Sequence, residues 1–124
     1  MNVPDNLFYT KNHEWICINE NDAIVGVTNY AQDELGDIIF IELPNKGTKF
    51  QSGDPVATIE AVKTVADIYI PLDGEILEVN RLLENEPEII NKDPYGKGWI
   101  IKLCNFPNDV SNLLTAIEYK TLIQ

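Results

Sequence analysis

Histidine and cysteine are scarce in this sequence of 124 residues, which has one histidine, His13, and two cysteines, Cys17 and Cys104. Two cysteines so far apart form neither a CxxC pair nor a disulfide framework, and this favours a reducing compartment. Three-ligand zinc sites and histidine-based catalytic relays usually need more such side chains. We therefore expect no metal site, and we expect both cysteines to pack as small apolar residues.

Basic residues are also few. Lys and Arg number 9 against 20 Asp and Glu, which gives a formal net charge of −11 and a pI near 4.3. A surface of this charge repels nucleic-acid phosphates and anionic lipids. The composition therefore argues against nucleic-acid binding and membrane-surface binding, and it favours partners with basic surfaces.

Long apolar runs are absent as well. No stretch approaches the roughly 18 to 20 apolar residues that a membrane span needs. The first residues, MNVPDN, resemble neither a secretory signal nor an Arg-rich transit peptide. From this we expect a cytoplasmic location in a bacterium, or the mitochondrial matrix if the chain is a processed eukaryotic protein.

Short β-type runs separated by turn residues fill most of the chain. The predicted strands are residues 14–19, 23–27, 37–43, 56–60, 65–70, 75–80 and 99–104. This pattern, in a chain long enough for one core, predicts a single domain over residues 1–124. Its fold class is mainly β, a compact sandwich or barrel-like domain.

Two short helices are predicted among the strands. The first spans residues 29–35, with Asn29 as its cap and Gly36 at its end. The second lies near residues 109–117, where apolar side chains recur at helical spacing and Asn108 or Asp109 can cap it. Residues 81–98, rich in Pro, Gly and Glu, are predicted to form a loop.

Lys63 occupies a distinctive place at the tip of the hairpin predicted from residues 56–70. Nine acidic residues and only one other basic residue, Arg81, lie between residues 51 and 90. Most surface lysines serve only solubility. Lys63, however, has short apolar neighbours, and at a hairpin apex its amine projects from the body of the domain. A modifying enzyme could reach it, and an amide there would remove the charge and create a long flexible arm.

Six blocks of the sequence are distinctive when taken together. They are KNHEW (11–15), GVTNYAQ (26–32), LGDIIFIELP (35–44), EAVKTVAD (60–67), GEILEVN (74–80) and DPYGKGW (93–99). With these blocks the sequence resembles the H-protein family of the glycine cleavage system. Their order and spacing match the family from about Tyr9 to the C-terminal helix. Several blocks in register are far more specific than one lysine hairpin, which lipoyl and biotinyl domains share.

The resemblance implies a lipoyl-type β-sandwich, or barrel-sandwich hybrid, of two small antiparallel sheets. It implies that Lys63 receives lipoic acid and that the chain is a carrier with no catalytic residues. The implied partners are a pyridoxal-phosphate glycine decarboxylase, a tetrahydrofolate-dependent aminomethyltransferase, a dihydrolipoyl dehydrogenase and a lipoate ligase or lipoyltransferase. The carrier itself is expected to be a monomer.

Two carboxylates match family positions near the resting arm. Glu14 and Asp67 are expected to accept hydrogen bonds from the ammonium of the aminomethyl group that the arm carries. Three positions depart from the usual family pattern, namely Ala61, Asn12 and Glu34. We expect these changes to leave the modification of Lys63 intact and to alter how the arm docks.

Other functions remain open at this point. A carrier of this type could relay lipoate to 2-oxoacid dehydrogenases. Biotin carriage is disfavoured, because biotinyl domains usually place methionines where Val62 and Thr64 stand. From other classes, the chain could be an unmodified β-rich interaction module or a cysteine-based redox enzyme.

Overall fold

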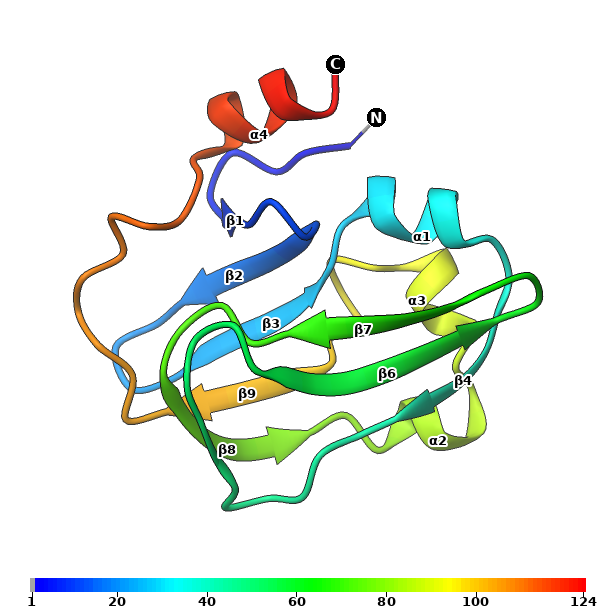
Figure 1. The fold of residues 1–124 in the computed structure, drawn as a ribbon, viewed down its shortest axis with the longest axis horizontal. Helices are drawn as coiled ribbons and strands as arrows, with labels where there is room; N and C mark the ends of the chain where they lie inside the picture. Colours follow the sequence, from blue (N-terminus) through cyan, green and yellow to red (C-terminus); the bar gives the residue numbers. More distant parts are fainter. Residues whose placement is uncertain (1) are drawn as a thin grey trace.

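The computed structural model describes residues 2–124 and contains two antiparallel sheets with short helices around them (Figure 1). The larger sheet has the order β1 (Phe8–Tyr9), β2 (Glu14–Ile18), β3 (Ala23–Val27), β9 (Ile101–Cys104), β8 (Gly74–Val79) and β5 (Lys49–Phe50). The smaller sheet has the order β4 (Ile38–Glu42), β6 (Pro55–Ala61) and β7 (Val65–Tyr69). The helices are α1 (Asn29–Leu35), α2 (Leu82–Asn85), α3 (Ile89–Lys92) and α4 (Ala116–Leu122). The predicted sandwich of two antiparallel sheets is confirmed.

The hydrophobic core lies between the two sheets. Side chains on the inner faces of both sheets point into this space, and the branched aliphatic ones fill it. Strand β4 departs from strict alternation, because the register shifts between Ile38 and Phe40 and both Ile39 and Phe40 are exposed. Fully buried examples are Ile16, Val25 and Leu103 from the larger sheet, and Ile41, Ile59 and Ile68 from the smaller one. The two sheets therefore hold each other in place and fix the position of the β6–β7 hairpin.

The sequence located most strands but missed the two shortest, β1 and β5. The strand predicted from residue 99 begins at Ile101 instead. The reason is a turn just before it, in which the Trp99 N–H donates to the Gly96 carbonyl over 3.2 Å. Strands of two residues have no periodicity to detect, so β1 and β5 exist only through their tertiary pairing.

Helix α1 occupies the predicted residues, but its N-cap is Thr28 and not Asn29. The Ala31 N–H donates to Thr28 Oγ1 over 3.1 Å, while the side chain of Asn29 accepts from the Gln32 amide over 2.8 Å. Gly36, at φ 77°, ends the helix as predicted, because glycine adopts positive φ at little cost.

Residues 81–98 are not the continuous loop that was predicted, since they include α2 and α3. Asn91 of α3 explains why this segment is ordered. Its side-chain oxygen accepts from the Ile38 N–H over 2.9 Å, and its amide donates to Gln32 Oε1 over 3.0 Å and to the Gly36 carbonyl over 2.9 Å. Asn91 thereby fixes the junction between α1 and β4.

The C-terminal helix was predicted wrongly near residues 109–117, because α4 runs from Ala116 to Leu122. Thr115 caps it in a capping box with Glu118. The preceding residue, Leu114, forms a strand-like bridge in which its N–H and carbonyl bond Tyr9 over 2.7 and 2.8 Å. Of the residues with helical apolar spacing, Val110, Leu113 and Leu114 lie in the loop before α4 and pack against the core. Ile117 lies in α4 and is exposed.

Candidate functional site

Lys63 is exposed at the tip of the β6–β7 hairpin, as the sequence predicted. The turn is closed by a hydrogen bond of 2.8 Å from the Ala61 N–H to the Thr64 carbonyl, and the Val62 N–H donates to the Asp37 carbonyl over 3.0 Å. The backbone at the tip is therefore anchored to the segment that leads into β4. The long side chain of Lys63 extends from a fixed base.

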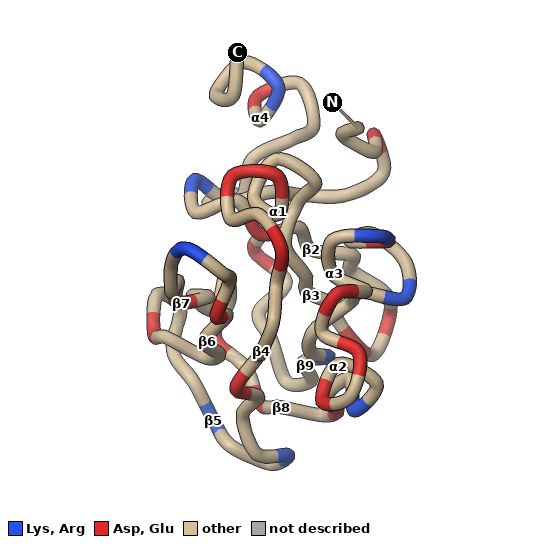
Figure 2. The backbone as a smooth tube through the Cα atoms, turned by 90° about the vertical axis from the view of Figure 1, so that its right-hand side faces the viewer, with Lys and Arg blue, Asp and Glu red and all other residues tan. Residues whose placement is uncertain are grey.

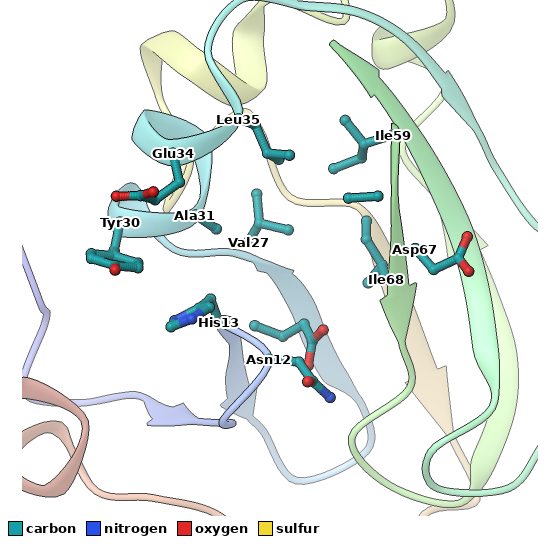
Figure 3. Close-up of a pocket in the computed structure, with 12 residues that line it drawn as sticks. Asn12, His13, Val27, Tyr30, Ala31, Glu34, Leu35, Ile59, Asp67 and Ile68 are labelled. Carbon is teal, nitrogen blue, oxygen red and sulfur yellow. The ribbon is translucent and has the colours of Figure 1, made fainter. Parts of the chain in front are cut away.

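A cavity of about 330 Å³ lies between α1, the larger sheet and the β6–β7 hairpin (Figure 3). Its apolar wall is formed by Val27, Ala31, Leu35, Ile59, Ala66 and Ile68. Its polar lining residues are Asn12, His13, Glu14, Tyr30, Glu34 and Asp67. Ala66 is three residues from Lys63, about 10 Å along a strand. The cavity is thus close to the base of any arm attached to Lys63.

Glu14, the first residue of β2, is buried beside this cavity with 2% of its surface exposed. Its carboxyl accepts from the Thr10 hydroxyl over 2.5 Å and from the Tyr69 N–H over 3.3 Å. Burial raises the pKa of Glu14 to about 7, although both hydrogen bonds act in the opposite direction. Near neutral pH the group therefore changes charge readily, and a cation in the cavity would favour its ionised form.

Glu14 also lines a second hollow of about 320 Å³. Thr10, Lys11 and Asn12 contribute to this hollow from the N-terminal side, together with Ser52 at its other edge. The buried carboxyl therefore forms part of the wall between two recesses.

His13 also lines the cavity, and it makes contacts that were not predicted from the sequence. Its Nδ1 lies 2.9 Å from the Tyr119 hydroxyl, which in turn lies 2.7 Å from Thr28 Oγ1. Its ring also packs against Tyr30 in a tilted arrangement, with 4.7 Å between the ring centroids. Burial lowers the pKa of His13, while the charge of Glu34 opposes this effect. His13 is thus held by aromatic neighbours and does not hydrogen-bond to Glu14. The sequence signal for this network was limited, because Tyr119 is 106 residues away.

Asp67 lies on the cavity-lining strand β7, but its carboxylate points away from His13 and Tyr30 in Figure 3. It accepts a hydrogen bond of 3.2 Å from the Thr58 hydroxyl across the hairpin. In this conformation the structure does not bring the carboxylates of Asp67 and Glu14 together. Strand alternation explains the difference, since the adjacent Ile68 occupies the inward position.

The three departures from the usual family pattern fall into two places. Asn12 and Glu34 line the cavity, so they can affect what binds there. Ala61 is buried at the end of β6 and does not line the cavity.

The cysteines lie in separate strands and both have free thiols. Cys17 is in β2 and Cys104 in β9, and β3 separates these strands in the sheet. Within residues 2–124, no three His, Cys, Asp or Glu side chains are grouped so that they could hold a metal ion. In the same part of the chain, no helix has the length and hydropathy to cross a membrane.

Comparisons with known proteins agree on one family. The family model described as glycine cleavage H-protein matches residues 7–124. A glycine cleavage system H protein from Herpetosiphon aurantiacus is 51% identical over 122 residues, which are 98% of this chain and 94% of that protein. A second, from Bacteroides thetaiotaomicron, is 50% identical over 126 residues, covering 99% of this chain and 98% of its own.

A solved structure supports the same assignment. The crystal structure of a glycine cleavage system H protein from Mycobacterium marinum matches with a TM-score of 0.89 and 38% identity, over 96% of this chain and 97% of that one. Fold, sequence and coverage therefore lead to one conclusion. The chain belongs to the glycine cleavage H-protein family, whose members are carrier components of that system and not its catalysts.

Proposed function

We propose that residues 1–124 form a single carrier domain of the glycine cleavage system, with lipoic acid attached to Lys63 through an amide bond. The observation that carries the proposal is the exposed amine of Lys63 at the tip of an anchored hairpin, next to a cavity with an apolar wall. When bound, the lipoyl dithiolane supplies a disulfide that accepts the aminomethyl group from glycine as its S–S bond breaks. The protein supplies the attachment point, the resting site and the docking surfaces.

The cavity suits both ends of a loaded arm. Its aliphatic lining, which includes Val27, Leu35 and Ile68, matches the apolar part of the arm. Glu14 offers a buried carboxylate to the ammonium of the aminomethyl group, and a charge-assisted hydrogen bond there would slow its loss to water. The geometry favours Glu14 over Asp67 for this role, because the Asp67 carboxylate would have to turn away from Thr58 first.

The proposed partners are the glycine decarboxylase that uses pyridoxal phosphate, the tetrahydrofolate-dependent aminomethyltransferase and dihydrolipoyl dehydrogenase. A lipoate ligase or lipoyltransferase would attach the arm. The net charge of −11 supports docking to basic surfaces on these enzymes. Tethering raises the local concentration of the dithiolane, so each contact can be weak, and we propose that the carrier works as a monomer. The relatives described above are bacterial proteins, which supports the bacterial cytoplasm as its location and not the mitochondrial matrix.

Intact mass after incubation with a lipoate ligase, lipoate and ATP tests the attachment site. We expect the wild-type chain to gain one lipoyl increment and the Lys63→Arg variant to gain none. Lys97→Arg is the matched control, because Lys97 is also an exposed lysine in a turn, and it should gain the full increment. Modification of the Lys63→Arg variant would contradict the proposal.

Release of the loaded aminomethyl group tests the resting site. In lipoylated protein loaded by the decarboxylase, Glu14→Gln should release ammonia several-fold faster than the wild type, because the ammonium loses its charged partner. Asp67→Asn serves as the comparison, because it removes a carboxylate from a different cavity-lining strand, β7, and we expect a smaller change. Equal release rates for the wild type and Glu14→Gln would remove Glu14 from the proposal.

A further inference from the structure

The outer face of the smaller sheet carries exposed apolar side chains beside Lys63. Phe40 and Val65 are 49% and 63% exposed, and they lie in one row with Glu60 between them, since Phe40 pairs with Glu60 and Glu60 with Val65. Directly opposed residues of neighbouring antiparallel strands project from the same face. Ile39 and Val62 add two more exposed apolar side chains at the edges of this row. We call this set, Ile39, Phe40, Val62 and Val65, the hairpin patch.

Carboxylates accompany the hairpin patch on the same face. The next row of the sheet pairs Glu42 with Thr58 and Thr58 with Asp67, so two acidic residues flank a threonine there. The strands β4, β6 and β7 contain no Lys or Arg. Figure 2 shows acidic segments along these strands, with basic colour at the turn that joins β6 to β7. The face thus presents apolar contacts and negative charge around one lysine.

Exposed apolar side chains grouped in this way commonly mark interaction sites. The charge of the face selects a partner with an apolar centre and Lys or Arg at its rim, since complementary charges guide association. The position of the hairpin patch beside Lys63 further limits which enzyme can bind there. The enzyme that acylates Lys63 must hold the lysine amine itself in its active site, so it has to contact the residues nearest the tip. Enzymes that act on the far end of a long arm can dock elsewhere.

Given the proposed lipoylation of Lys63, we propose that the hairpin patch is the docking surface for the ligase that attaches lipoate. The ligase covers Phe40 and Val65 with apolar side chains and places basic residues opposite Glu42 and Asp67. The Lys63 amine, after losing a proton, attacks the carbonyl of the activated lipoyl group. The amide forms as the activating phosphate ester leaves with the electron pair of its bond to that carbonyl.

Steady-state lipoylation of the full chain by a purified lipoate ligase, with lipoate and ATP, tests this surface. The double variant Phe40→Ser/Val65→Ser should lose at least about tenfold in kcat/KM, mainly through a higher KM, because the anchors of an interface carry most of its affinity. The matched control removes two exposed apolar residues from α4 as Ile117→Ser/Leu122→Ser. In Figure 1 this helix lies at the top, away from the β6–β7 turn at the right-hand side. Its kcat/KM should stay within about twofold of wild type.

A competition assay separates docking from chemistry. The Lys63→Arg protein cannot accept lipoate but keeps the hairpin patch, so we expect it to inhibit lipoylation of the wild type competitively. The same protein with Phe40→Ser/Val65→Ser should inhibit at least about tenfold more weakly. Circular dichroism checks that each variant is folded. If the double variant does not fold, Val62→Ser replaces it, because Val62 lies at the turn and outside the paired strands.

The outcomes distinguish this inference from the function on which it rests. Normal kcat/KM and normal competition by the patch variants would overturn the docking surface while leaving lipoylation of Lys63 intact. A wild-type chain that gains no lipoyl mass would overturn both. Equal losses in the patch variants and in the α4 control would also overturn the docking surface, because the effect would then not be local.

Discussion

Replacing Glu14 by Gln should change how the stability of the protein depends on pH. Burial gives Glu14 a pKa of about 7 in the folded state, against 4.5 for an ordinary glutamate. Between these values the unfolded chain releases the proton while the folded chain keeps it, so a rise in pH favours unfolding. At 1.36 kcal/mol per pKa unit, the wild type loses about 3 kcal/mol of stability between pH 4.5 and pH 8 through this group. Full stability from Glu14 is present only below pH 4.5.

The Glu14→Gln variant cannot ionise at this position, so it escapes that loss. The amide has one acceptor oxygen where the carboxylate has two, and the contact to Thr10 or to the Tyr69 N–H is weakened. This costs about 1 kcal/mol at every pH. The informative quantity is therefore how the stability difference between the variant and the wild type changes with pH. The free energy of unfolding of the variant minus that of the wild type should rise by about 3 kcal/mol from pH 4.5 to pH 8.

Urea unfolding at several pH values, followed by tryptophan fluorescence, measures this difference. Contributions from the other titrating groups cancel, because both proteins share them. A difference that stays constant within about 1 kcal/mol over the range would show that Glu14 ionises at an ordinary pH. Burial would then not account for a role of Glu14 beside the cavity.

Two further changes test the fold, and a third tests whether the cysteines have a function. Thr115→Ala removes the cap of α4 and should cost about 1 kcal/mol, visible as a fall in Tm of about 3 to 5 °C. Gly26→Ala places a Cβ 2.7 Å from the Trp15 indole, which is fixed by its hydrogen bond to a backbone carbonyl, and should destabilise by about 1 to 3 kcal/mol in urea unfolding. Cys17→Ser combined with Cys104→Ser should leave turnover of the loaded arm unchanged in a glycine decarboxylation assay, and a collapse of turnover in a folded protein would reveal a thiol function.

The lysine hairpin was predictable because its signals are local. Strand-forming residues run on both sides of a short reversal, and Lys63 is the residue that this arrangement places at the tip. The error at the C-terminus has the opposite origin. Apolar spacing from Val110 to Ile117 is helical, yet pairing of Leu114 with Tyr9 holds that segment extended, and Ile117 is 76% exposed. The capping box at Thr115 was the better local signal for α4. A capping box specifies the residue at which a helix starts, whereas apolar spacing indicates only which face of a helix would be buried.

The cavity could be anticipated only in part, because four separate segments form it. Resemblance indicated Glu14 and Asp67, but it carried no information on their side-chain directions or burial. Alternation along β7 does carry such information. If Ile68 is a core residue, Asp67 must face the other way, toward Thr58 and the outer surface. The Asp67 carboxylate, which points away from the proposed resting site, therefore lies on the same outer face of the sheet as the hairpin patch. We therefore propose that one hairpin separates two tasks, with its inner side sheltering the arm and its outer side presenting Lys63 to the enzyme that modifies it.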